Sequence, residues 1–338
     1  MALTDVFGSD VFSTASLTAA IEKAPIVRSR LGELGLFTQV PVKGTSVVLE
    51  WSNGKIGLVP TTPRGAPAPL REREKRSAHN ATVPHIQVED CVLADDILNV
   101  RMFGSEDTES GIMSVVNRKL ARMAQDIEAT LEYLRAGAIQ GLVTYPTGST
   151  DANLNLYTLM GTTEVEVEFD FGTGEDVLTQ VMEMVDAVLE NLGNAPINGI
   201  KVICGRTFFR SLIAHESTKD AYKYQVSQFL REDQRNGFSF GGNTTIPVTF
   251  EEYYNRLGAV TYFPAAEARA VPLGDPNLFH VALAPADFVE AAGTLGQPIY
   301  SKSEEMPLGK GVLLHAQSNP LFYCTRPEAL VSCTIAES

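Results

Sequence analysis

Residues 112–141 of the chain read IMSVVNRKLARMAQDIEATLEYLRAGAIQG. Apolar side chains recur here every three or four residues, at Ile112, Val116, Leu120, Met123, Ile127, Leu131, Leu134 and Ala138. This spacing predicts one helix with a continuous apolar stripe. Thr108 and Ser110 can cap its start, and Gly137 and Gly141 can end it. At about 1.5 Å per residue the helix is roughly 40 Å long, so the sequence predicts a strut between sheet-like segments.

The composition is that of an ordinary globular protein. The chain has 338 residues, of which 44% are hydrophobic and 20% charged, and this length allows two or three domains around a large core. No apolar run approaches the ~18 residues of a membrane span. The N-terminal stretch MALTDVFGSDVFSTASL holds acids and no basic residue, unlike a signal peptide. We therefore expect a protein kept in the cytoplasm, with no membrane partner.

The formal net charge of −14 argues against a protein that binds nucleic acid through its phosphates, because such binding needs clustered lysine and arginine. One dense basic patch is present, formed by Arg71, Arg73, Lys75 and Arg76. Glutamates interrupt this patch, so it indicates a solvated or subunit-bridging face and not a DNA groove. An acidic surface repels DNA and fits the wall of a container.

The sequence contains no complete catalytic or cofactor motif: GxSxG, GxxxxGK[ST], GxGxxG and HExxH are all absent. The five histidines show no helical spacing typical of metal ligands. Four cysteines lie far apart in the sequence, at Cys91, Cys204, Cys324 and Cys333. No two of them form a CxxC pair, so we expect small buried thiols in strands and neither disulfides nor zinc. We expect no catalysis and no cofactor.

One stretch leaves a metal site open as an alternative. Acids alternate with apolar residues from Glu164 through Glu166 and Glu168 to Asp170, which predicts a strand with one acidic face. A solvated strand face is the simpler interpretation, because the ligands of one ion usually come from different segments. The rival interpretation is a metal-assisted hydrolase that uses these four carboxylates.

The region before the long helix lacks a core of its own. Residues 1–45 predict an extended arm with a short helix near residues 17–23, and RSRLGELGLF after it is too glycine-rich to fold alone. Residues 46–59 predict a hairpin that turns at Asn53-Gly54 and returns directly afterwards. Prolines then make a rigid tip, and residues 81–92 are extended again. We predict a projecting β-loop that finds its core on a neighbouring chain.

The region after the long helix predicts a compact α/β or α+β domain. A helix is expected at residues 175–192, ended by Gly193, with another at 207–215. Strands are expected at residues 201–204, 246–250, 259–263 and 278–283. Three further extended segments, at 297–301, 311–317 and 329–335, are expected to pair in a sheet that supports the long helix.

Five stretches resemble the major capsid protein E family of tailed bacteriophages, the lambda-type shell subunit. They are IEK through RSRLGELGLF at 21–37, VPTTPRGAP at 59–67, VPHIQVEDCVLADDILNVRMFG at 83–104, TLEYLRAGAIQG at 130–141 and SNPLFYCTRPEALV at 318–331. Each motif is short, but their order and spacing across nearly the whole chain make the set specific. The family often has an Asp-Gly turn after the GAIQG-like end of the helix. TYPTGST stands there instead, so that hairpin is expected to differ in shape.

The resemblance implies an α+β tailed-phage capsid fold of the HK-ninety-seven type. The expected parts are an N-terminal arm (1–45), an extended loop (46–82), a peripheral domain (83–174) with a spine helix at about 110–138, an axial domain (175–290) and a C-terminal return to the peripheral domain (291–338).

The resemblance also implies a function, which is self-assembly as hexamers and pentamers into an icosahedral head. The head would enclose double-stranded DNA without reading its sequence. Expected partners are other copies of the chain, portal and scaffolding proteins, and a decoration protein. We expect assembly in the host cytoplasm and a final place in the virion. An encapsulin-type compartment, which shares the fold but holds protein cargo, is the alternative.

Charged residues near the arm and loop are the candidates for contacts between subunits. They are Arg28, Arg30, Glu33, Arg64, Arg71, Arg73, Arg76, His85 and Arg101. The arginines of the loop are expected to meet acidic partners on the adjacent subunit.

Overall fold

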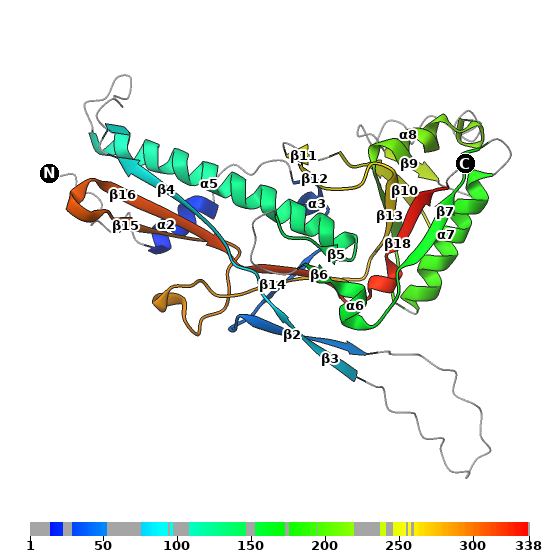
Figure 1. Ribbon diagram of the computed structural model, residues 1–338, viewed down its shortest axis with the longest axis horizontal. Coiled ribbons are helices and arrows are strands. Elements are labelled where there is room, and N and C mark those ends of the chain that lie inside the picture. Colours follow the sequence, from blue (N-terminus) through cyan, green and yellow to red (C-terminus); the bar gives the residue numbers. More distant parts are fainter. Residues whose placement is uncertain are drawn as a thin grey trace, which may run out of the picture.

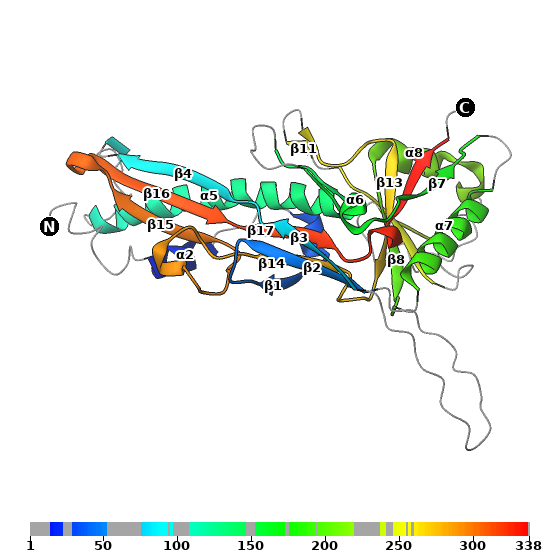
Figure 2. The same ribbon diagram turned by 60° about the horizontal axis from the view of Figure 1, so that its bottom comes forward.

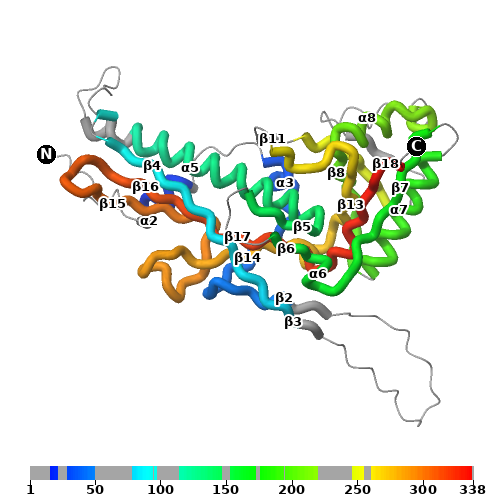
Figure 3. Tube along the Cα trace, in the orientation of Figure 1, coloured from blue at the N-terminus to red at the C-terminus, as the bar shows by residue number. Residues whose placement is uncertain are grey.

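The computed structural model is an elongated molecule in which three sheets follow one another along the long axis (Figure 1). It describes residues 14–22, 29–52, 76–93, 95–96, 108–146, 153–172, 176–193, 195–219, 237–240, 246–254, 256–257 and 260–336. The C-terminal part of the chain passes through all three sheets in turn, from β16 through β17 to β18 (Figure 3). Among the described residues, no helix is long and apolar enough to cross a membrane.

The long helix predicted from the apolar stripe is α5 (Thr108–Ile139). Val116, Leu120, Met123 and Ile127 of the stripe are buried in one core cluster. After the helix the backbone takes a left-handed φ of 76° at Gly141, which turns the chain away from the helix axis.

A three-stranded antiparallel sheet lies against the N-terminal half of α5. Its order is β15 (Tyr300–Glu305), β16 (Gly311–Ser318) and β4 (Ile86–Leu93). The short helix α2 (Thr14–Glu22) packs against β15 and α5 through Leu17 and Ile21. The hydroxyl of Thr18 on α2 accepts a hydrogen bond from the Ser301 N–H at 3.1 Å, and this bond fastens the arm helix to the edge of the sheet.

A second three-stranded sheet lies at the middle of the molecule (Figure 2). It consists of β1 (Thr38–Pro41), β14 (Phe279–Leu283) and β17 (Pro320–Cys324). β1 and β14 run parallel, and β17 is antiparallel to β14. The sheet packs on the C-terminal half of α5 through Val281, Leu283 and Phe322, which meet Leu134 and Ala138. The arm therefore contributes one strand, β1, to this sheet.

The third sheet forms the end of the molecule opposite to α2. Its six strands lie in the order β7 (Val165–Phe169), β18 (Val331–Ile335), β13 (Glu267–Leu273), β8 (Gly199–Cys204), β10 (Val248–Glu252) and β9 (Gly237–Phe240). Helices α7 (Val177–Leu192) and α8 (Arg206–Ala214) pack on it in one core cluster. The side chain of Asp176 caps α7 by accepting from the Leu178 N–H, as polar residues do at helix starts.

The six-stranded sheet corrects three expectations. β13 lies at its centre but was not predicted, because Arg269 and Pro272 hide its apolar pattern. β18 was expected beneath the long helix, but it pairs between β7 and β13, where Val331 and Cys333 complete the core. β14 was expected in the compact domain that follows the long helix, but it belongs to the middle sheet.

The projecting loop begins as a two-stranded ladder of β2 (Ser46–Ser52) with β3 (Arg76–Thr82). The predicted return strand at residues 55–59 and the Asn53-Gly54 turn lie outside the described residues. Val47, Leu49 and Ala81 are buried in the core of their own chain, because the ladder places them on one face. The base of the loop thus has a core without a neighbouring subunit.

Short elements complete the chain. They are α3 (Arg30–Glu33), β5 (Leu142–Val143), β6 (Leu154–Asn155), α6 (Leu156–Met160), β11 (Arg256–Leu257), β12 (Val260–Thr261) and the 3-10 helices η3 (Val289–Ala291), η4 (Pro307–Gly309) and η5 (Pro327–Ala329). The strand expected at 259–263 is reduced to β12. All four cysteines lie in strands, as predicted; Cys204, Cys324 and Cys333 are buried, whereas Cys91 is only partly buried.

Candidate functional site

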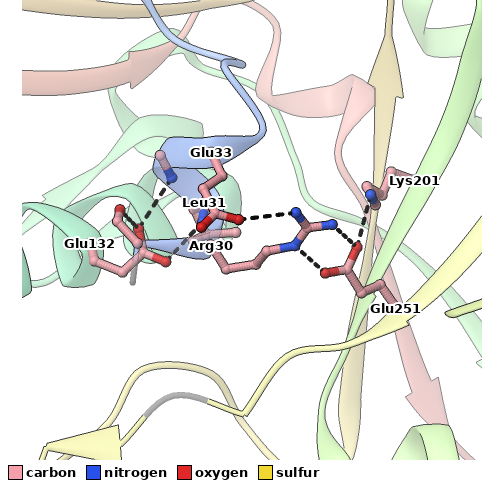
Figure 4. Close-up of polar contacts among 8 residues, drawn as sticks. Arg30, Leu31, Glu33, Glu132, Lys201 and Glu251 are labelled. Atoms are coloured by element: carbon pink, nitrogen blue, oxygen red, sulfur yellow. Dashed lines mark hydrogen bonds and ion pairs between the residues drawn. The ribbon is translucent and has the colours of Figure 1, made fainter. Parts of the chain in front are cut away.

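The described part of the chain holds a buried polar cluster where the arm, the long helix and the six-stranded sheet meet. Figure 4 shows how side chains from these three parts point toward one another. We call this cluster the arm joint, and it consists of Ser29, Arg30, Leu31, Gly32, Glu132, Arg135, Lys201, Glu251 and Tyr253.

Glu132 of α5 is the centre of the arm joint. Its side chain is only 2% exposed, an unusual position for a carboxylate. Its two oxygens accept from the Leu31 N–H at 2.8 Å, the Gly32 N–H at 3.3 Å and the Ser29 hydroxyl at 2.5 Å. The first N–H groups of a helix have no partner within the helix. Glu132 therefore supplies the cap that the short helix α3 lacks.

Two further groups hold the Glu132 carboxylate. The hydroxyl of Tyr253, directly after β10, donates to it at 3.1 Å. The guanidinium of Arg135 lies 3.6 Å away on the same helix and also bonds Glu128 at 2.6 Å. A buried charge is tolerated when opposite charge and hydrogen bonds satisfy it. Glu132 thus links arm and sheet through the helix.

Arg30 extends the arm joint to the six-stranded sheet. Its guanidinium grips Glu251 of β10 with two nitrogens: Nε donates to one carboxylate oxygen, and Nη2 donates to the other at 2.7 Å. Lys201 of β8 adds an ion pair to the same carboxylate at 2.8 Å. Two-point arginine–carboxylate contacts are directional as well as strong. The arm is therefore fixed in orientation as well as in position.

The electrostatics of this contact follow from burial and pairing. Burial pushes the pKa of the Glu251 carboxyl upward, but hydrogen bonds from Arg30 and Lys201 outweigh it, so the net pKa lies below the ordinary value. The hydrogen bond to Glu251 is the main reason that the pKa of Arg30 is raised. Both groups are thus held in their charged forms.

Gly32 is needed for the close approach of arm and helix. A Cβ on this residue would lie 2.5 Å from the Ser29 Oγ and 3.3 Å from a guanidinium nitrogen of Arg135. Both of those groups belong to the arm joint. A larger side chain at position 32 would therefore push apart the atoms that surround Glu132.

The structure brings two of the predicted contact residues together. Arg30 belongs to the arm joint, and Glu33 meets Arg30 at 3.4 Å from one turn later. His85 lies elsewhere, exposed between β3 and β4, with its Nδ1 2.7 Å from the side-chain oxygen of Asn319. The remaining candidates lie outside the described residues: Arg28, Arg64, Arg71, Arg73 and Arg101, together with the side chain of Arg76.

The sequence analysis did not predict the two acidic residues that bind the arm, Glu132 and Glu251. Glu132 interrupts no apolar repeat, since it lies beside the stripe between Leu131 and Leu134. Glu251 directly follows the apolar end of a predicted strand, which was the only available signal. Neither residue could be paired with its arm partner from the sequence, because about 100 residues separate Glu132 from Gly32 and about 220 separate Glu251 from Arg30.

The acidic strand behaves as a solvated face. Glu166 and Glu168 on β7 are exposed. Glu164 forms an ion pair with the buried Arg269 at 2.6 Å, and Asp170 accepts from the Gly172 N–H. Within the described residues, no group of three or more histidines, cysteines or acids is placed to hold a metal ion.

Solved structures share this architecture. A prophage protein of E. coli CFT073, described as a capsid protein, superposes with a TM-score of 0.60 at 14% identity, covering 96% of this chain and 99% of that one. The capsid of a native GTA particle gives 0.51 at 13% identity, covering 93% and 92%. A chain of Mycobacterium phage Bobi gives 0.50 at 12% identity, covering 97% and 99%. The fold is therefore the tailed-phage capsid fold of the HK-ninety-seven type.

Sequence comparison identifies the family. The family model described as phage major capsid protein E matches residues 13–335, so the chain belongs to that family. The major capsid protein of Pseudomonas phage KPP10 is 27% identical over 337 residues, which cover 95% of this chain and 96% of that protein. The major capsid protein of Salmonella phage Felix O1 is 24% identical, with 95% of each chain covered. The chain is a structural subunit of an icosahedral phage shell.

Proposed function

We propose that the protein assembles as hexamers and pentamers into an icosahedral head around double-stranded DNA. The family match over residues 13–335 carries this proposal. The elongated subunit supports it, because a projecting ladder and a long helix offer separate surfaces to several neighbours (Figure 1). Many moderate contacts then give strength through multivalency.

The parts of the subunit would divide this task. We assign the six-stranded sheet with α7 and α8 to the capsomer centre, as the axial domain proposed for residues 175–290. We assign α5 with β15, β16 and β4 to the periphery. The segment 291–338 links both regions, because its strands β15 and β16 lie at the periphery and its strand β18 lies in the six-stranded sheet. The arm (1–45) and the loop (46–82) would reach toward neighbouring subunits.

The arm joint has a mechanical role in this proposal. It ties the arm to α5 through Glu132 and to β10 through Arg30 and Glu251. A load on the arm is therefore shared between the helix and the six-stranded sheet. No chemical step is needed for this role, and we propose that the subunit is not an enzyme.

The net charge of −14 suits a wall that encloses DNA without adhering to it. Portal and scaffolding proteins would join during assembly in the host cytoplasm, and a decoration protein would bind the finished shell. The arginines of the loop would meet acids on the adjacent subunit.

Electron microscopy and sedimentation of the purified protein, with and without co-expressed scaffold, test the proposal. We expect rings, shells or tubes. A monomer that persists at high concentration under both conditions would refute self-assembly. Nuclease treatment of particles from infected cells then identifies the content, since protected long DNA indicates a phage head and a protein cargo indicates an encapsulin.

A further inference from the structure

The segment at residues 311–335 supplies one strand to each of the three sheets along the molecule (Figure 3). β16 is the central strand of the first sheet, between β15 and β4. β17 pairs with β14 in the middle sheet, and β18 lies between β7 and β13 in the six-stranded sheet. Each sheet is therefore complete only when its part of this segment has joined it.

The six-stranded sheet depends on β18 for its connection to β7. The five residues of β18 pair in parallel with β7, from Val331 opposite Val165 to Ile335 opposite Phe169. On its other edge β18 pairs antiparallel with β13. Among the described strands, β7 pairs with β18 alone. Without β18, β7 would be separated from the sheet, and both β7 and β13 would present unpaired edges, which promote aggregation.

The side chains of this segment also complete the core of the six-stranded sheet. Val331 and Cys333 are fully buried in the cluster that includes α7, α8 and Phe169 of β7. Just before the strand, Nη1 of Arg326 donates to the Leu192 carbonyl at 2.7 Å and so satisfies an acceptor at the C-terminal end of α7. Because α7 contacts both β7 and β18, the same segment supports the helix and the strand.

An ion pair spans β18 from one neighbouring strand to the other. Arg269 of β13 lies opposite Ser332 of β18, and Ser332 lies opposite Glu166 of β7. The Arg269 guanidinium reaches past β18 and donates at 2.6 Å to Glu164, which directly precedes β7. Ser332, the residue between the two neighbours, is only 3% exposed. The ion pair thus joins β7 and β13 across the inserted strand.

The neighbours of β18 are synthesised long before it. β7 ends at Phe169 and β18 ends at Ile335. At about 5–20 residues per second, β7 waits on the order of 10–30 s for its partner. Of the three sheets, the six-stranded one is completed last, since β16 ends at Ser318 and β17 at Cys324. Pairing between segments so distant in sequence is also slow, because a long loop must close first.

We infer that β18 is a closing strand, which withholds the assembly-competent shape of the subunit until the chain has been synthesised past Ile335. Before that point β7 is not joined to the six-stranded sheet and α7 lacks part of its support. Such a chain does not present the end of the molecule that we assign to the capsomer centre, so it does not enter a shell. The benefit rests on the proposed self-assembly, because a shell of many copies is damaged by a few defective subunits.

Ribosome-bound chains test the closing strand without any assembly step. Residues 1–338 are followed by a flexible linker and a translation-arrest peptide. A short linker leaves β18 inside the exit tunnel, and a long linker frees it. We expect a brief protease pulse to cut the six-stranded sheet roughly tenfold or more faster with the short linker, since cleavage follows the open population. Equal resistance with both linkers would overturn the inference.

Ser332→Pro with the long linker makes this test specific for β18. Proline cannot donate to the ladder, so the strand should not insert although the whole segment has left the tunnel. Cuts should then fall in the six-stranded sheet, while β4 and β16 stay resistant. Wild-type resistance throughout this variant would show that the sheet closes without β18.

Native-state hydrogen exchange of the unassembled full-length protein provides a second test. Glu164→Gln removes the charge that holds Arg269 across β18, so amides of β7 and β18 should exchange together and roughly tenfold faster. Amides of β8 and β10 should keep their rates. Glu166→Gln is the matched control, because it removes the same charge from an exposed position of β7 and leaves the contact between Arg269 and Glu164 intact. Equal rates in the two variants would contradict the bridging role of the ion pair.

The closing strand and the proposed function fail separately. If wild type forms no particles, self-assembly fails, and the ribosome experiment still decides whether β18 closes the sheet. If wild type forms particles, a chain that stops after Thr325 is co-expressed with it. We expect this chain to be depleted roughly tenfold or more in the particles, since a lattice position needs several correct contacts. Incorporation in proportion to its expression would refute the exclusion of unfinished chains.

Discussion

Replacing Glu132 with glutamine keeps the size of the side chain and removes its charge. The amide oxygen can still accept from the Leu31 N–H and the Tyr253 hydroxyl. The amide nitrogen cannot accept from Gly32 N–H or from the Ser29 hydroxyl, which both face the other carboxylate oxygen. The Gly32 N–H and the Ser29 hydroxyl, both donors, therefore face an amide nitrogen that is also a donor, in a site that water does not reach.

The structure sets the size of this effect. Hydrogen bonds to a charged group are worth about 1.5–3 kcal/mol each, and the Ser29 hydroxyl can rotate to accept from the new amide. One buried N–H then loses its acceptor, and Arg135 loses part of its charge balance. We expect Glu132→Gln to lower the free energy of unfolding locally by about 2–3 kcal/mol. Since about 1.4 kcal/mol is a factor of ten, the arm should open roughly 30 to 150 times more often.

Native-state hydrogen exchange measures this opening directly. The amides of Leu31 and Gly32 should exchange faster by the stated factor, while amides in β8 keep their rates. Glu128→Gln is the matched control, because Glu128 lies one turn earlier on α5 and bonds Arg135 but no arm residue. Equal exchange at the arm in the two variants would refute the capping role of Glu132.

Three further predictions concern the arm joint and Leu308, which lies between β15 and β16. The pKa of Glu251 is depressed, so its contribution to stability is complete above about pH 5 and is lost as pH falls through the folded pKa. Glu251→Gln should therefore lower the free energy of unfolding by about 1–3 kcal/mol at pH 7. In a denaturation series from about pH 7 to 3, the variant should also lose less stability toward acid pH than wild type does. Gly32→Ala places a Cβ 2.5 Å from Ser29 Oγ and should destabilise the subunit by about 1–3 kcal/mol in urea titration, whereas an unchanged midpoint would show that the arm shifts freely. Leu308→Gly relieves left-handed strain at an exposed position, so thermal unfolding of the unassembled subunit should report a gain of about 0.5–1 kcal/mol after the entropy cost of glycine, and a loss would contradict the strain.

The elements that follow local rules were predictable. The apolar residues from Val116 to Leu134 recur with the period of a helix, so they predicted α5 without any knowledge of the segments that pack on it. The helix α7 followed in the same way. β13 was not predictable, because the partners of Arg269 in its middle, Glu164 and Tyr157, come from distant segments.

The sequence by itself determined the long helix, the arm, the first strand of the projecting loop and, through its motifs, the shell family. Only the tertiary structure decided where β18 pairs and which acids receive Arg30. The physical reason is that helix periodicity depends on neighbours three or four residues away, whereas sheet order and buried ion pairs depend on surfaces that meet after folding. Glu132 illustrates this. In the sequence it is one polar residue beside an apolar stripe, and in the folded subunit it caps a helix about 100 residues earlier in the chain.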